Sequence, residues 1–237
     1  MKKNIFKSLA FCLGLFIPAF ATGSAMAAST QEDLQIRIDS AKVVLDAVLN
    51  APDHGVPMTI LKQATCVAVI PGLLKGAFVF GAEYGQGVVT CRTGHGWSGP
   101  VFIRLAGGSF GFQIGGQATD LVLIAVNEHG FQDLLKDKFK IGGDAAASAG
   151  PVGRNSQAAT DLKMGAELLT YSRSKGLFAG IDLNGASVSQ NHDDTAVYYG
   201  QSYGFQTVLH GDVPVPQGAT NFVRTVAKAF VNAKENY

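Results

Sequence analysis

A serine in a glycine-rich stretch near the middle of the chain has the sequence context of a hydrolase nucleophile. Residues 107–111, Gly-Gly-Ser-Phe-Gly, fit the G-x-S-x-G pattern, in which a preceding strand and a following helix lift the serine hydroxyl above a sheet. Phe110, Phe112 and Ile114 instead continue at the two-residue period of a strand. We therefore predict that Ser109 opens a strand and is not catalytic, with a serine hydrolase as the less favoured alternative.

An acidic cluster could supply ligands for a divalent cation. His192, Asp193 and Asp194 are consecutive, and Asp182 and Asn184 precede them. Adjacent residues on one loop rarely converge on a single ion, and the sequence has neither a calcium-loop motif nor an H-E-x-x-H motif. The pattern is more typical of a solvated acidic turn, so we expect no metal site, no cofactor and no catalytic residue.

Two cations separated by one residue form the most informative polar pattern. Arg173 and Lys175 alternate with small hydroxyl residues, which at strand period places both charges on one face. Arg154 is a third candidate for the same place, and guanidinium groups match phosphate in a bidentate geometry. We predict a headgroup-binding role for Arg173, Lys175 and Arg154. The alternative is a solvated strand face with ion pairs to Asp161 or Glu167.

The pattern between residues 65 and 190 predicts a sheet. Short runs rich in Val, Ile and Phe alternate with glycines, which indicates consecutive antiparallel strands. The expected strands are residues 66–70, 77–83, 87–92, 101–105, 109–114, 121–126, 168–172, 177–183 and 186–189. We interpret the glycines of residues 81–87 and 107–116 as turn glycines, with a tight turn at Tyr84-Gly85-Gln86. Trp97 is expected in the core.

Helical periodicity flanks this region. Expected helices cover residues 30–50, 58–63, 131–139 and 217–234. The first of them has an apolar face, a face with charges of both signs, and a capping-box pattern formed by Thr30 and Asp33. These elements predict a single α+β domain over residues 28–237. Its core is a glycine-rich antiparallel β-sheet, barrel- or sandwich-like, flanked by N-terminal and C-terminal α-helices.

The first residues have the three-part layout of a secretory signal peptide. Three lysines, Lys2, Lys3 and Lys7, precede an apolar run over residues 9–20, and Ala25-Met26-Ala27 supplies the small residues of a cleavage site. We predict a signal peptide over residues 1–27, cleaved after Ala27, and a periplasmic mature protein; a retained anchor is the alternative. Removing three lysines changes the formal net charge from +1 to −2, which argues against a nucleic-acid partner.

Cys66 and Cys91 are the cysteines downstream of the predicted signal peptide. An even pair in an oxidising compartment is consistent with one disulfide. Both residues lie in apolar, strand-like runs, so the sequence allows either a cross-strand Cys66–Cys91 bridge or two buried free thiols.

Eight segments in order resemble the SYLF domain family. They are Gly72-Leu-Leu-Lys-Gly-Ala-Phe-Val-Phe-Gly81, Tyr84-Gly-Gln-Gly-Val-Val89, Trp97-Ser-Gly-Pro100, Gly111-Phe-Gln-Ile-Gly115, Ala118-Thr-Asp-Leu-Val-Leu123, Ala149-Gly-Pro-Val-Gly-Arg154, Tyr171-Ser-Arg-Ser-Lys-Gly-Leu-Phe-Ala-Gly180 and Tyr198-Tyr-Gly200. The resemblance runs from about residue 34 to the C-terminus. It implies binding to phosphoinositides or other membrane lipids and, in some eukaryotic members, to actin filaments.

The resemblance and the cationic strand together predict a function. We expect an exported, membrane-associated protein that binds a phospholipid or another membrane lipid and has no catalytic activity. An apolar groove between the sheet and a terminal helix would take acyl chains, while Arg173, Lys175 and Arg154 would contact the headgroup. The alternative is an envelope structural or protein-interaction module that recruits a protein partner through its sheet.

Overall fold

The computed structural model describes residues 28–49, 56–78, 80–110, 115–151, 166–174, 177–180, 183 and 185–235. The strands are β1 (Cys66–Phe78), β2 (Phe80–Thr93), β3 (Gly96–Trp97), β4 (Val101–Phe110), β5 (Gly115–Ala125), β6 (Lys138–Lys140), β7 (Ala147–Ala149), β8 (Leu168–Ser174), β9 (Leu177–Gly180) and β10 (Ser187–Gln190). The helices are α1 (Gln31–Leu49), α2 (Met58–Gln63), α3 (Glu128–Leu134), α5 (His192–Tyr199), α6 (Phe205–His210), the 3-10 helix η1 (Gln217–Ala219) and α7 (Thr220–Glu235).

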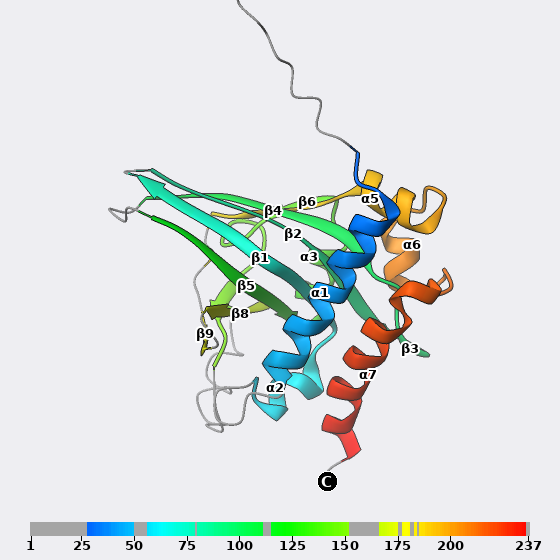
Figure 1. The fold of residues 1–237 in the computed structure, drawn as a ribbon. Coiled ribbons are helices and arrows are strands. Elements are labelled where there is room, and N and C mark those ends of the chain that lie inside the picture. Colours follow the sequence, from blue (N-terminus) through cyan, green and yellow to red (C-terminus); the bar gives the residue numbers. More distant parts are fainter. Residues whose placement is uncertain are drawn as a thin grey trace, which may run out of the picture.

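These strands form one curled sheet in the order β6-β10-β4-β2-β1-β5-β8-β7, with β3 and β9 paired to β2 and β8 off this path. Helices α1 and α7 lie side by side across one face of the sheet (Figure 1). The predicted α+β class, with helices from both ends of the chain against a glycine-rich sheet, is therefore confirmed. The sheet is mixed, however, because β7 and β8 pair in parallel whereas the other neighbouring strands in the described part are antiparallel.

Helix α1 begins at the predicted cap. The hydroxyl of Thr30 accepts a hydrogen bond from the backbone N–H of Asp33, and the backbone N–H of Thr30 donates to the Asp33 carboxylate. This reciprocal pair satisfies two backbone donors that a helix N-terminus leaves without partners. The hydrogen bonds from Thr30 also lower the pKa of Asp33. One helical face, including Leu34, Ile38 and Leu45, is buried against the sheet and α7.

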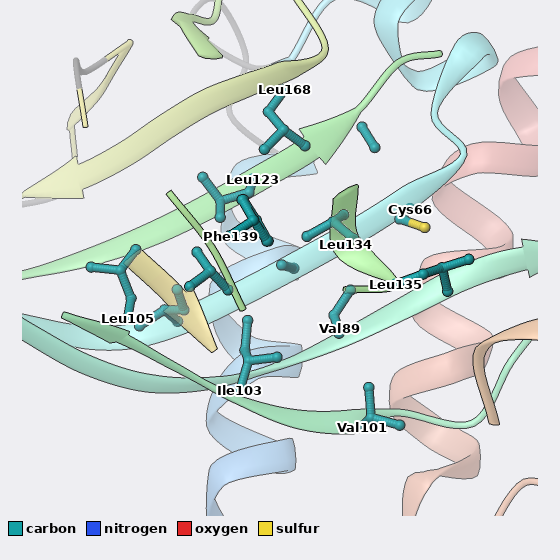
Figure 2. Close-up of a cluster of buried hydrophobic side chains, with 14 of the residues drawn as sticks. Cys66, Val89, Val101, Ile103, Leu105, Leu123, Leu134, Leu135, Phe139 and Leu168 are labelled. Atoms are coloured by element: carbon teal, nitrogen blue, oxygen red, sulfur yellow. The ribbon is translucent and has the colours of Figure 1, made fainter. Parts of the chain in front are cut away.

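The sheet has a separate apolar core on each face. The first lies under α1, α2 and α7 and includes Val69, Val88, Phe102 and Phe230. The second lies on the opposite face, where Leu134, Leu135 and Phe139 cover alternate side chains of the central strands (Figure 2). Because successive strand residues point to opposite faces, a strand buried between two such layers is apolar at nearly every position.

The disulfide between Cys66 and Cys91 is present in the second core. The two cysteines are register partners on β1 and β2, and both are completely buried. Of the two arrangements that the sequence allows, the structure therefore adopts the cross-strand bridge.

The sequence predicted shorter central strands than the structure has. The predicted tight turn at Tyr84-Gly85-Gln86 is wrong, because these residues lie inside the 14-residue strand β2. There Tyr84 pairs with Leu74 and Gln86 pairs with Arg104. On β1, a bulge that shifts the register between Ile70 and Leu73 turns both of these residues towards the second core. Gly72, within the bulge, has a φ of 59° that favours glycine.

Three further elements differ from the predicted ones. The helix expected over residues 131–139 ends at Leu134, and Phe139 instead belongs to β6, where it enters the second core. Helices α5 and α6 were not predicted, because each is short and its apolar periodicity covers only about two turns.

The glycines of the long strands are not turn glycines, contrary to prediction. On the face of the second core, Gly85 and Gly87 leave room for the bulged part of β1: a Cβ at Gly87 would lie 2.1 Å from the carbonyl oxygen of Val69. On the opposite face, a Cβ at Gly76 would meet nothing within 4 Å. Packing therefore requires glycine at positions 85 and 87 but not at position 76.

Replacing Gly87 with alanine is expected to lower the free energy of unfolding by about 2 kcal/mol, because the new methyl group must displace the backbone of β1. Gly76→Ala is the matched control. It is expected to be neutral or to stabilise the protein by about 0.5 kcal/mol, since alanine restricts the unfolded chain. Urea unfolding of the two variants measures the difference, and equal midpoints would contradict this distinction between the glycines.

Candidate functional site

The outer half of the sheet has one face that no described helix covers. Strands β1, β2, β4 and β5 run on past α1, on the side away from α7 (Figure 1). Register places Leu74, Tyr84, Ala106 and Ala118 in one row across these strands. The next row outward contains Gly76, Ala82 and Gly108. We call these seven residues the open face.

The open face is apolar and exposed. Leu74 is 60% exposed and Tyr84 is 43% exposed, which is unusual for large apolar side chains on a sheet that buries both of its faces elsewhere. The remaining five residues are glycine or alanine, and all are exposed. A Cβ at Gly108 would lie 3.8 Å from its nearest neighbour, the carbonyl oxygen of Gly81. The surface is therefore a floor of glycine and alanine residues beside two projecting side chains, Leu74 and Tyr84, which are register partners on neighbouring strands.

A polar network lies at the base of the open face, where the sheet passes under α1. Arg37 on α1 donates one hydrogen bond to Asp194 at 2.6 Å and a second to Gln86 Oε1 at 2.6 Å. Gln86 Nε2 then donates to the Tyr84 hydroxyl at 2.9 Å. The Arg37 guanidinium also lies 5.6 Å from the ring centre of Phe102. The network fixes both the helix and the Tyr84 side chain relative to the sheet.

Arg104 lies opposite Gln86 in the strand register. It donates a hydrogen bond to Asn191 Oδ1 at 2.8 Å, and within the described part of the chain it forms no ion pair with a carboxylate. Asn191 caps α5 and also donates to Asp194. The guanidinium of Arg104 thus stands at the edge of the open face with most of its donors available.

The predicted solvated acidic turn is wrong for one of its three residues. Residues 192–194 form the first turn of α5, and Asp194 is buried and paired with Arg37. His192 and Asp193 are exposed, as expected. The sequence could not reveal this difference, because Arg37 is 157 residues away from Asp194 along the chain.

The structure brings one of the predicted headgroup residues to the same face of the sheet. Arg173 on β8 pairs with Asp120 on β5 in register, and the two side chains are 3.8 Å apart. Of the two partners suggested by the sequence, Glu167 accepts a hydrogen bond from the backbone N–H of Ala146, and Asp161 lies outside the described residues. Lys175 and Arg154 lie outside the described residues.

The predicted apolar groove between the sheet and a terminal helix is not there in the described residues. Buried side chains of α1 and α7, among them Ile38, Val226 and Phe230, fill that space. A pocket of about 600 Å³ lies at the start of α1 instead, lined by Gln31, Glu32, Gln35, Tyr198, Pro216, Gln217 and Gly218. Burial raises the pKa of Tyr198 to about 12, so its hydroxyl remains protonated at neutral pH and donates to Gln35.

Ser109 lies inside β4 and pairs with Gly81. It therefore lacks the strand–turn–helix setting of a nucleophile elbow.

Trp97 is buried in the first core, as predicted. The described residues contain no group of three or more His, Cys, Asp or Glu side chains that could hold a metal ion. Among the described helices, none is both long enough and apolar enough to cross a membrane.

Comparisons with known proteins agree on one family. Residues 106–229 match the Ysc84 family, described as "Las17-binding protein actin regulator". Protein YSC84 of Saccharomyces cerevisiae is 33% identical over 183 residues, which cover 75% of this chain and 39% of the yeast protein. SH3 domain-containing YSC84-like protein 1 is 34% identical over 172 residues in Rattus norvegicus and 31% identical over 189 residues in Homo sapiens. The matches to these two mammalian proteins cover 72% and 79% of this chain, but 50% and 55% of the relatives' own lengths.

Proposed function

Because the chain belongs to the Ysc84 family, whose domain is also called SYLF, we propose that it is an exported lipid-binding protein that associates with a membrane surface and catalyses no reaction. The observation that carries the proposal is the open face. It offers exposed apolar side chains beside a floor of glycine and alanine residues, with guanidinium groups at its base. An amphiphile has the same division between an apolar chain and a polar end.

The energetics of the open face support this assignment. Full burial of one large apolar side chain contributes about 1.5–3 kcal/mol. Leu74 and Tyr84 are each more than two-fifths exposed in the unbound protein, so much of this free energy would be gained only when a ligand covers them. An acyl chain laid against these two side chains, over the row of Gly76, Ala82 and Gly108, would remove both of them from water. The absence of side chains at Gly76 and Gly108 lets the acyl chain approach the strand backbone.

Replacing Leu74 and Tyr84 together with serine is expected to weaken lipid binding at least about tenfold, because roughly 1.5 kcal/mol of apolar burial is lost. The matched control is the Ile36→Ser, Val43→Ser double variant, which removes two exposed apolar side chains of α1. Co-sedimentation with vesicles of phosphatidylethanolamine and phosphatidylglycerol measures the binding. Equal losses in the two variants, or no loss in either, would contradict the proposal.

Export is part of the proposal. The predicted signal peptide places the mature N-terminus at Ala28, just before α1. The buried disulfide supports an oxidising compartment, because cytosolic proteins rarely retain such bonds. The intact mass of the protein from a periplasmic extract should correspond to a chain that starts at Ala28 and has the bridge closed. Recovery of the full-length chain in the cytosol would contradict export.

A protein-interaction module is the second candidate function, favoured by the names of the relatives. The family description refers to binding Las17, and a yeast relative is named LAS seventeen-binding protein 3. The open face would then dock a protein surface in place of a lipid. A photoreactive amino acid at Ala82 distinguishes the two functions in intact cells. Crosslinks to lipid favour the proposal, and a crosslink to a single envelope protein favours the alternative.

A further inference from the structure

We infer that Arg104 and Tyr84 together form an anion subsite at the base of the open face, so that the bound amphiphile carries a phosphate or a similar anionic headgroup in a fixed orientation. This inference rests on the proposed function and names the polar end of the same site. It differs from the sequence-based prediction, which assigned the headgroup to Arg173, Lys175 and Arg154.

The two arginines near the base of the open face, Arg37 and Arg104, differ in how their charges are balanced. Arg37 has its charge balanced by Asp194, at 2.6 Å, and both side chains are largely buried. Arg104 is only half-buried and, within the described part of the chain, is held by a neutral amide, Asn191. A guanidinium has five N–H donors, so most of those of Arg104 can reach a ligand. Charge complementarity at this point favours an anion.

The hydroxyl of Tyr84 accepts a hydrogen bond and keeps its own hydrogen to donate. Gln86 Nε2 donates to the Tyr84 hydroxyl, because Gln86 Oε1 is already occupied by Arg37. A phenol that accepts one hydrogen bond keeps its own hydrogen for another acceptor. Arg104 lies opposite Gln86, and Tyr84 is in the next row outward on the same face. Because the two residues occupy neighbouring rows of one face, their donors could bind one acceptor-rich group at the inner end of the floor.

The open face extends from Arg104 in one direction, along β4. From Arg104, the open face continues along β4 through Ala106 to Gly108. Four strand residues span about 13 Å, the length of a medium acyl chain. A headgroup at Arg104 therefore places the chain over Gly108, alongside Tyr84 on the neighbouring strand. The opposite orientation would put an anion on a surface without a donor side chain among the described residues.

Two monomeric short-chain lipids test the inference: dihexanoylphosphatidylglycerol, which has an anionic phosphodiester headgroup, and dihexanoylglycerol, which has the same acyl chains and no phosphate. The wild-type protein is expected to bind the anionic lipid about tenfold more tightly, because one charge-assisted contact distinguishes the two lipids. Arg104→Gln should abolish that preference, and Arg104→Lys should retain part of it. Arg224→Gln, which removes an exposed arginine of α7, is the matched control and should leave the preference unchanged.

The other possible outcomes separate a failure of the anion subsite from a failure of lipid binding itself. Equal binding of the two lipids by the wild-type protein, or an unchanged preference in Arg104→Gln, would overturn the anion subsite and leave the proposed lipid-binding function standing. Binding of neither lipid would overturn both. Inorganic phosphate is the third probe: if it binds as tightly as the anionic lipid, the ligand is a soluble phosphate compound and the acyl part of the inference fails. Thermal unfolding of each variant separates loss of binding from loss of structure.

Discussion

Replacing Asp194 with alanine is expected to lower the free energy of unfolding by about 3 kcal/mol, the loss typical of breaking a buried ion pair on one side. Asp194 accepts a hydrogen bond from Arg37 at 2.6 Å and another from the amide of Asn191. Without the carboxylate, the Arg37 guanidinium keeps one polar partner, Gln86, in a largely buried position. The substitution also removes half of the reciprocal cap that starts α5.

Asp193→Ala is the control for that prediction, because Asp193 precedes Asp194 on the same helix turn but is exposed. An exposed acid near a helix N-terminus contributes only about 0.5 kcal/mol. Chemical unfolding monitored by circular dichroism compares the two variants. Similar losses would mean that the Asp194–Arg37 pair contributes no more than the helix dipole does. The Asp194 variant should also bind lipid more weakly, since Arg37 positions Gln86 and, through it, Tyr84.

Removing the disulfide by Cys66→Ala and Cys91→Ala is expected to lower the free energy of unfolding by about 3 kcal/mol, because the bridge restricts the unfolded chain. The cysteines are 25 residues apart in sequence. Both lie in the second core, so alanine also leaves a small cavity in place of each sulfur. The two strands remain paired through the neighbouring positions of the register, so the variant should still fold.

Dithiothreitol provides the control for this second prediction. Under conditions in which it reduces the unfolded chain, it should destabilise the wild-type protein by a similar amount and leave the double variant unchanged. A wild-type unfolding curve that dithiothreitol does not move would contradict the contribution assigned to the bridge.

Much of the fold could be predicted because local patterns and tertiary structure agree at the ends of the chain. Thr30 and Asp33 form the expected cap, and the apolar face of α1 is the buried one. The long strands could not be predicted, because glycine most often signals a turn. In this sheet, Gly85 and Gly87 instead make room for a bulge on the neighbouring strand. That requirement arises only once β1 and β2 are paired.

For the candidate site, the sequence pointed to the type of side chain, a cation on a strand, but not to Arg104 itself. The sequence pointed to cations beside a hydroxyl-rich strand, and Arg173 does lie on the face of the sheet that continues into the open face. Arg104 gave no sequence signal, because it is a single charge within an apolar strand. Its role depends on Gln86 across the register and on Asn191, which is 87 residues away along the chain. Such a site exists only in the assembled sheet.

Native mass spectrometry of the protein purified from a cell-envelope fraction tests the central claim most directly. We expect a phospholipid or similar amphiphile to co-purify with the wild-type chain at a ratio of one to one. This ligand should be largely lost from the Leu74→Ser, Tyr84→Ser variant and kept by the Ile36→Ser, Val43→Ser variant. A wild-type mass free of lipid, in a preparation that unfolds cooperatively, would contradict lipid binding and direct attention to a protein partner of the open face.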